Sequence, residues 1–291
     1  MAEFNRVILL FFIYSFIGWL WETVYCSLKA KHFVYRGFLV GPITPIYGFG
    51  ILGVLYFIEP FQQNLFLLYG LSAILVTILE YLTSYVLEKL FHATWWDYHD
   101  VPLNINGRVA VPVSLFWGIG CVLIVRVVHP RVLILEEFLV DKFQFYLPIA
   151  LVCITLIDLT YTIINMAAFK KATQQLEEAI ELRKAELQVS LDETKDEFSK
   201  RIAEARENAT SRFDQLTADV ANYRKDKPTA AEWLHSFQEN PKLKANLPKL
   251  NLTQRRLLKN FPKLKLMDAK NTEDIRQLVE LLKKNNEEKR K

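Results

Sequence analysis

Residues 65–87 read LFLLYGLSAILVTILEYLTSYVL, and this stretch decides the fold of the chain. An α-helix of about 20 residues crosses a hydrocarbon core of about 30 Å. Glu80 is the one charged residue in the stretch. The sequence therefore predicts a membrane-spanning helix that carries a carboxylate inside the membrane.

Apolar runs of similar length lie on both sides of this stretch, at Val7–Tyr25, Phe38–Ile58, Val109–Val128 and Phe143–Ala168. Soluble helices are rarely apolar all round over five successive segments. The mean hydropathy of +0.10 is low because it averages two unlike halves of the chain. We therefore predict an all-α, polytopic membrane protein with about five transmembrane helices.

The orientation follows from the basic residues that flank the runs. Lys170 and Lys171 follow the fifth run, and Lys29, Lys31 and Arg36 lie in the connector after the first. Basic connectors favour the cytoplasmic side. This predicts a multi-pass protein of the plasma membrane with a cytoplasmic C-terminus.

Residues 126–142 fit this orientation least well, because a basic connector there would lie outside. Either Arg131–Val140 is a short interfacial helix, or the fourth span ends elsewhere.

The second half of the chain differs in composition. Residues 170–227 contain no Gly and no Pro, and Pro228 follows them directly. Their apolar residues recur in steps of three and four. This pattern predicts a long cytoplasmic helix that pairs as a coiled coil with another copy or folds back as a hairpin. We accordingly divide the chain into a transmembrane domain (1–169), a coiled-coil helix (170–227) and a C-terminal region (228–291).

The C-terminal region, residues 228–291, is basic, with 15 Lys and Arg against 8 Asp and Glu. Its apolar residues predict a small helical unit broken by prolines. Positive charge beside a membrane is commonly attracted to anionic lipid headgroups, so membrane lipids are the expected partner. No nucleic-acid-binding motif supports the alternative of a nucleic-acid partner.

Ionisable residues inside the runs are candidates for function, because charge in a membrane costs several kcal/mol. They are Glu22, Glu80 and Asp158, and each lies in the later part of a run that heads inward. With Arg36 and Arg108 in the connectors, they predict a polar cavity on the cytoplasmic side. Alternatively, each acid makes a buried ion pair or hydrogen bond that fixes helix packing.

The second run contains Pro42, Pro45 and several glycines at its cytoplasmic end. Proline removes a backbone donor and obstructs the preceding turn. The run therefore predicts a broken or re-entrant segment, of a kind that builds substrate sites in transporters. Close packing through small residues is the alternative.

The connector from Trp95 to Arg108, WWDYHDVPLNINGR, is richer in polar and aromatic residues than a turn requires. Its rings fit an aromatic belt at headgroup level, which leaves Asp97, Asn104, Asn106 and Arg108 as binding candidates. Asn106-Gly107 is a turn signal. Arg108 would hold a phosphate or carboxylate, or pair with Asp97 or Glu80.

Cysteine and histidine spacing predicts no disulfide, no metal site and no cofactor. His92 and His99 flank the tryptophan pair seven residues apart, and this spacing does not predict a metal site.

Several motifs together resemble the bacterial membrane proteins grouped as ABC-transporter permeases of the CmpB type. They are Phe16-Ile-Gly-Trp-Leu-Trp-Glu22, Arg36-Gly-Phe-Leu-Val-Gly-Pro42, Pro45-Ile-Tyr-Gly48, Leu79-Glu-Tyr81 with Ser84, Trp95-Trp-Asp-Tyr98, Asn104-Ile-Asn-Gly-Arg108 and Phe116-Trp-Gly118. The resemblance covers about residues 5–168 and departs from the family pattern at His99. It implies a permease. The chain has no P-loop motif, so any ATPase would be a separate subunit.

These observations leave three functional hypotheses. The favoured one is a permease-like protein that handles a small or anionic ligand at the polar cavity. A membrane enzyme acting on a lipid or phosphorylated substrate, and a membrane-anchored coiled-coil scaffold, are the alternatives; no nucleophile–base pair or metal cluster favours the enzyme. The expected ligand-binding residues are Glu22, Arg36, Pro42, Glu80, Asp97, Asn104, Asn106 and Arg108.

Overall fold

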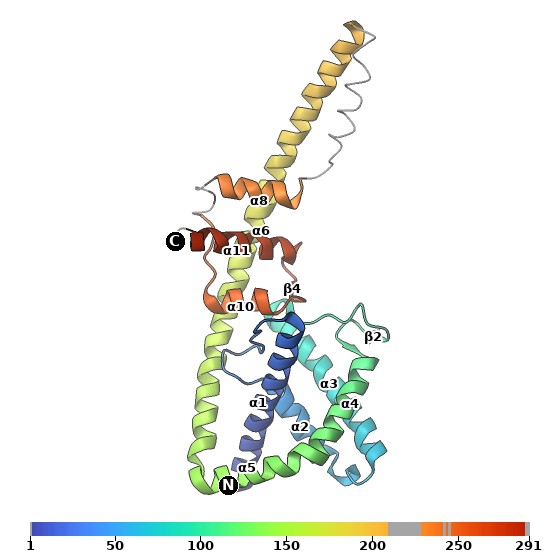
Figure 1. Cartoon of the computed structure of the whole chain (residues 1–291), viewed down its shortest axis with the longest axis vertical. Helices are drawn as coiled ribbons and strands as arrows, with labels where there is room; N and C mark the ends of the chain where they lie inside the picture. The colour runs from blue at the N-terminus through green and yellow to red at the C-terminus, as the bar shows by residue number, and fades with distance from the viewer. Residues whose placement is uncertain (1, 209–227, 241–242, 244–245, 289–291) are drawn as a thin grey trace. The chain divides into compact units, whose positions relative to one another are not determined.

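A computed structural model describes residues 2–208, 228–240, 243 and 246–288 (Figure 1). The chain divides into two compact units. The first, called the membrane unit, combines residues 1–170 with Asn251–Asp268. The second, called the helical unit, combines Lys171–Leu250 with Ala269–Lys291. The C-terminal region of the sequence is thus shared between the two units.

Four helices of the described chain are long and apolar enough to cross a membrane. They are α1 (Ala2–Ala30), α3 (Leu65–Phe91), the continuous helical stretch Val111–Phe143 and the first part of α6 (Tyr146–Asn208). Each corresponds to an apolar run in the sequence. The expected fold class, an all-α polytopic membrane protein, is confirmed.

The second apolar run differs from the expected full-length span. Its helix, α2, covers only Pro45–Phe57, 13 residues, with Pro45 in its first turn. At 1.5 Å per residue it is about 20 Å long, too short for a hydrocarbon core of about 30 Å. The expected break at the proline-rich end is confirmed. The expectation of five full spans is corrected to four long helices and this half-length one.

The fourth helical stretch bends before it ends. It consists of α4 (Val111–Leu123), a π-helical turn (Ile124–Val128) and α5 (His129–Phe143). A π-helical turn and the proline at the start of α5 both bend a helix. Figure 1 shows α5 turning across the end of the bundle where the N-terminus lies.

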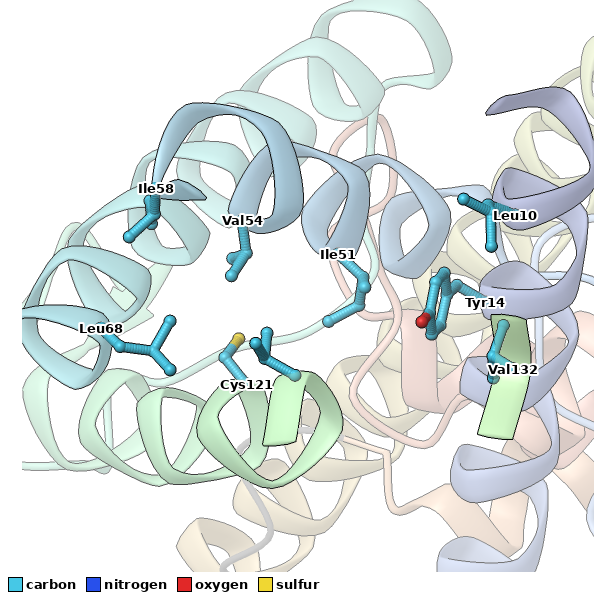
Figure 2. Close-up of a cluster of buried hydrophobic side chains, with 9 residues drawn as sticks. Leu10, Tyr14, Ile51, Val54, Ile58, Leu68, Cys121 and Val132 are labelled. Atoms are coloured by element: carbon cyan, nitrogen blue, oxygen red, sulfur yellow. The ribbon is translucent and has the colours of Figure 1, made fainter. Parts of the chain in front are cut away.

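One apolar cluster holds α1 to α5 together (Figure 2). Its buried members are Leu10, Tyr14, Ile51, Val54, Ile58, Leu68, Cys121, Val125 and Val132. Two glycines allow α1 and α2 to approach closely enough for this packing. A Cβ atom on Gly18 would lie 2.2 Å from the ring of Tyr47, and one on Gly48 would lie 2.3 Å from Ser15 Oγ.

The helical unit is formed by the later part of α6 with α8 (Ala230–Glu239) and α11 (Thr272–Glu288). Trp233 and Phe237 of α8 and Ile275 of α11 are buried. Lys184 Nζ of α6 lies 2.5 Å from an oxygen of Asp274. The helix expected after the membrane half is present as far as Asn208, but residues 209–227 of the expected coiled coil lie outside the described residues.

The rest of the membrane unit consists of short elements. The 3₁₀ helix η1 (Glu59–Phe61) lies between α2 and α3, and α10 (Leu252–Asn260) contacts α6 at Asn165. Strand β1 (Ala93–Thr94) pairs antiparallel with β4 (Lys265–Leu266). Strands β2 (Asn104–Ile105) and β3 (Val109–Ala110) form a hairpin.

Candidate functional site

The two polar connectors of the membrane half lie together, as the orientation predicted. The ring of Phe38, from residues 31–44, packs against Phe91 and Trp95 at centroid distances of 5.1 and 5.2 Å. We call this end of the membrane unit, where residues 31–44 and 92–110 meet, the connector end. The helix ends and the irregular segment before α2 place the polar side chains there.

Arg36 is held from several directions. Its Nη2 donates to Glu22 Oε1 at 3.1 Å, and its Nη1 donates to the carbonyl oxygen of Asn260 at 2.7 Å. The guanidinium also lies over the ring of Phe261, 4.1 Å from its centroid. Its side chain is only 15% exposed. Glu22 and Arg36 therefore form a shielded ion pair, which a third group from the C-terminal region completes.

Glu80 lies inside α3 with one oxygen paired and one not. Its Oε1 accepts a hydrogen bond from the Tyr98 hydroxyl at 3.1 Å. Its Oε2 is buried, and no residue of the described chain donates a hydrogen bond to it. A buried acceptor without a donor is costly, which makes this atom a candidate binding position.

Two tyrosines lie near both Glu80 and the Glu22–Arg36 pair. Burial, together with the nearby charges of Glu80 and Glu22, raises the pKa of the Tyr98 phenol, while Arg36 opposes that rise. Tyr47, near the start of α2, lies within electrostatic reach of the same three charged groups and Tyr98. We call Glu22, Arg36, Tyr47, Glu80 and Tyr98 the Glu80 cluster. The sequence analysis did not single out Tyr47 and assigned Tyr98 to an aromatic belt. Both tyrosines nevertheless belong to motifs that resemble the family, Pro45-Ile-Tyr-Gly48 and Trp95-Trp-Asp-Tyr98.

Asp158 supports the irregular segment before α2. It accepts hydrogen bonds from the backbone N–H groups of Val40 at 3.0 Å and Gly41 at 2.7 Å, and from the Thr162 hydroxyl at 3.1 Å. Backbone at membrane depth must find such partners within the protein. Asp158 thus supplies acceptors for backbone N–H groups ahead of α2, and the ligand-binding role of Pro42 stays a prediction.

The Asn106-Gly107 turn is confirmed, with positive φ angles of 53° and 65° between β2 and β3. Asn104 accepts from Gly107 N at 3.1 Å and donates to Val101 O at 2.9 Å. Asn106 donates to the Tyr81 hydroxyl at 3.2 Å. In the structure both asparagines hold the connector in shape, and their ligand-binding role stays a prediction.

Arg108 pairs with a residue that the sequence reasoning did not single out. Its Nη1 lies 2.7 Å from Glu88 Oε2, and its guanidinium faces the rings of Tyr81 and Tyr85. The hydrogen bond to Glu88 raises the pKa of Arg108. The alternative that Arg108 pairs with Asp97 or Glu80 is therefore wrong, because its carboxylate partner is Glu88. Glu88 lies near the end of α3, close to the start of α4.

Asp97 pairs with the C-terminal region instead. Its Oδ2 lies 2.5 Å from Lys265 Nζ, and its Oδ1 accepts from His99 N at 2.9 Å. Burial alone would raise the pKa of Asp97, but the hydrogen bonds from Lys265 and His99 hold it well below its usual range. Trp95 beside it is 5% exposed, because it packs between Phe38 and Phe261 instead of facing lipid.

The structure therefore gathers Glu22, Arg36 and Glu80 into one cluster and gives Asp97 and Arg108 separate partners. In the described part of the chain, no three His, Cys, Asp or Glu side chains lie close enough to hold a metal ion. The chemistry available is hydrogen bonding and charge pairing at the broken start of α2.

No curated protein and no solved structure matches the chain. A family model does match, over residues 9–163 of the 291, which include Glu22, Arg36, Glu80, Asp97 and Arg108. Because this match covers more than half of its length, the chain belongs to the family described as "Putative ABC-transporter type IV".

Proposed function

We propose that the chain is the membrane-spanning subunit of a transporter and that it handles a small or anionic ligand at the connector end. The family membership and the four apolar helices support a membrane protein of the transporter type. The finer parts of the proposal are the ligand, its site and the orientation, with the connector end and the C-terminus facing the cytoplasm of a bacterial plasma membrane.

The buried, unpaired Oε2 of Glu80 carries this proposal. Glu80 lies opposite Tyr98 and near the Glu22–Arg36 pair, where α2 begins only at Pro45. Half-length helices and irregular backbone of this kind build ligand sites in transporters. A ligand with a hydrogen-bond donor would satisfy Glu80, and an anionic oxygen would compete for Arg36.

The chain carries no P-loop motif, so the energy for transport would come from a separate ATPase subunit. Membrane lipids surround the exposed apolar faces of the long helices. Self-association through residues 170–227 remains a further part of the proposal, and it does not depend on the Glu80 cluster.

Native mass spectrometry of the protein, purified from its own membrane in a mild detergent, tests the site. We expect the wild-type protein to retain a bound small molecule and the Glu80→Gln variant to lose it, with both proteins folded. Gln keeps the size of the side chain but replaces one carboxylate oxygen with a donor. Glu59→Gln, at an exposed acid in η1, is the matched control and should retain the molecule.

Retention of the same molecule by both Glu80→Gln and Arg36→Gln would refute the site. The enzyme and the scaffold remain as alternative outcomes. Turnover of a lipid by the purified protein alone would favour the enzyme. A phenotype that is lost on deletion of residues 170–291 but unchanged in the Glu80 and Arg108 variants would favour the scaffold.

A further inference from the structure

A segment from outside the family region forms part of the connector end. Residues 251–268, which we call the cover segment, follow the family match by more than 80 residues, yet they belong to the membrane unit. Most of its large apolar side chains are buried, with Leu257 and Leu264 1% exposed and Phe261 6% exposed, whereas Leu252 and Met267 are exposed. A tail that only sampled a lipid surface would not bury such side chains against the family region.

Backbone pairing fixes the register of the cover segment. Ala93 pairs with Leu266 and Thr94 with Lys265, and Met267 N donates to His92 O at 2.9 Å. Strand β4 thus pairs with β1, which directly precedes the Trp95–Arg108 connector. The two lysines on either side of Leu264 are therefore brought to one acid.

That acid is Asp97. Lys265 Nζ lies 2.5 Å from its Oδ2, and Lys263 Nζ donates to its backbone carbonyl at 2.7 Å. We call these contacts the Asp97 latch. The side chain of Asp97 is only 13% exposed, so the negative charge on its carboxylate is poorly solvated by water. The ion pair with Lys265 therefore matters more for Asp97 than it would for an exposed acid.

The other end of the cover segment lies on Arg36 and the irregular segment. Asn260 Nδ2 donates to Tyr35 O at 2.9 Å, and Arg256 Nη2 donates to Leu39 O at 3.0 Å. Asn260, whose carbonyl accepts from Arg36, is the last residue of α10. The last carbonyls of a helix lack intrahelical donors and carry part of the negative end of the helix dipole.

The partner of Arg36 is thus an oxygen with partial negative charge, placed where an oxygen of an anionic ligand would bind. Phe261 covers the face of the same guanidinium, 4.1 Å away. While α10 is in place, one of the two terminal nitrogens of Arg36 is committed to Asn260 and the other to Glu22. An anion that takes the place of Asn260 on Nη1 of Arg36 has to displace the helix end.

We propose that the cover segment is an internal competitor for Arg36, in which the C-terminal carbonyl of α10 stands in for an anionic ligand and the Asp97 latch holds it there. The inference rests on the proposed function, because it assumes that an anion binds at Arg36. It adds that access from the connector end is regulated by residues 251–268, which lie outside the family region. Weakening the latch should therefore expose Arg36 and strengthen anion binding.

Hydrogen exchange measured by mass spectrometry on the full-length protein, in an uncharged detergent, tests the latch. In the wild type, peptides covering residues 92–96 and 262–268 should exchange slowly. In Lys263→Glu/Lys265→Glu, which replaces attraction to Asp97 with repulsion, we expect both peptides to exchange at least tenfold faster. Lys249→Glu/Lys259→Glu makes the same change in net charge at two exposed lysines and should behave as the wild type. Equal protection in all three proteins would overturn the latch.

Anion titration tests the competition, with inorganic phosphate and acetate as probes. Because a site that is closed most of the time binds with an affinity reduced by its open fraction, we expect the latch variant to bind one of the two anions about tenfold more tightly than the wild type. Adding Arg36→Gln to the latch variant should remove that binding. An opened latch with no gain in affinity for either anion would overturn the competition.

The same titration in nanodiscs of phosphatidylcholine, with and without phosphatidylglycerol, identifies the source of the anionic oxygen. Faster exchange of residues 262–268 caused by phosphatidylglycerol alone would assign it to a lipid headgroup, and faster exchange caused by the soluble anions would assign it to a free ligand. Absence of both effects in the latch variant would overturn the inference. It would leave the proposed function standing if the molecule retained by the wild type still depends on Glu80. Loss of that dependence instead refutes the proposed function.

Discussion

The replacement of Gly48 by alanine is the sharpest test of how α2 is held against α1. A Cβ atom on Gly48 would lie 2.3 Å from Ser15 Oγ and 2.7 Å from the backbone oxygen of Phe11. The backbone of α1 has to move to admit it. Overpacking of this kind costs about 1–3 kcal/mol, and we expect about 2–3 kcal/mol because a backbone atom is in the way.

Gly50→Ala in the same helix is the matched control. Its Cβ would meet only Leu79 Cδ2, at an ordinary 3.5 Å. Both replacements gain about 0.5–1 kcal/mol from the lower entropy cost of alanine in a helix, so the difference between them isolates the overpacking. A difference of about 2–3 kcal/mol corresponds to a melting temperature about 5–10 °C lower for Gly48→Ala than for Gly50→Ala.

A thiol-reactive fluorogenic dye can follow this unfolding in detergent. Cys121 is 3% exposed and lies in the cluster of Figure 2, so it reacts only when the bundle opens. Cys26→Ser and Cys153→Ser remove the two more accessible thiols from the background. If Gly48→Ala melts at or above the temperature of Gly50→Ala, the close approach of α1 and α2 is refuted.

Three further predictions concern the connector end. Asp158→Ala removes the acceptor of two backbone N–H groups and should lower the free energy of unfolding by about 2–4 kcal/mol. Thr160→Ala on the same helix is the control and should leave the melting temperature nearly unchanged. Equal melting temperatures of the two variants would contradict the supporting role of Asp158. Glu88→Gln should destabilise the protein more than Glu59→Gln does, because it leaves the shielded Arg108 without its carboxylate, and thermal unfolding at low and high salt would show the difference. The pKa of Asp97 is held below its usual range, so the Asp97–Lys265 ion pair stabilises the folded state above about pH 3.9. This stabilisation is lost only as the pH falls below that value. The protection of residues 262–268 from hydrogen exchange, corrected for intrinsic exchange rates, should therefore be equal at pH 5 and pH 7.

The long helices were predictable because about 20 apolar residues in a row have few other stable arrangements. The break before α2 was also predictable, since Pro42 and Pro45 cannot continue a helix. The length of α2 was not, because Phe38–Leu39–Val40 is apolar enough to join the run. The irregular conformation at Val40 and Gly41 is held by hydrogen bonds to Asp158, more than 100 residues away in the chain.

The candidate site was predictable in its residue types and only partly in its pairings. Glu22 and Glu80 are predictable from the cost of charge inside a membrane and Arg36 from its place in a polar connector, and the structure places all three near one another. Glu88 is harder to single out, because an acid near the end of a span can reach water easily. The contact of Asp97 with Lys265 joins residues 168 positions apart, and local pattern carries no information about such a pair.

The membrane unit is made from two stretches of chain that are separated by the helical unit. A ribosome adds about 5–20 residues per second, so Asn251 is added roughly 4–16 s and Asp268 roughly 5–20 s after Lys170. During that interval the spans are already complete while Arg36 still lacks Asn260 and Phe261. The order of synthesis therefore gives every new copy of the protein a brief period in which its connector end is uncovered.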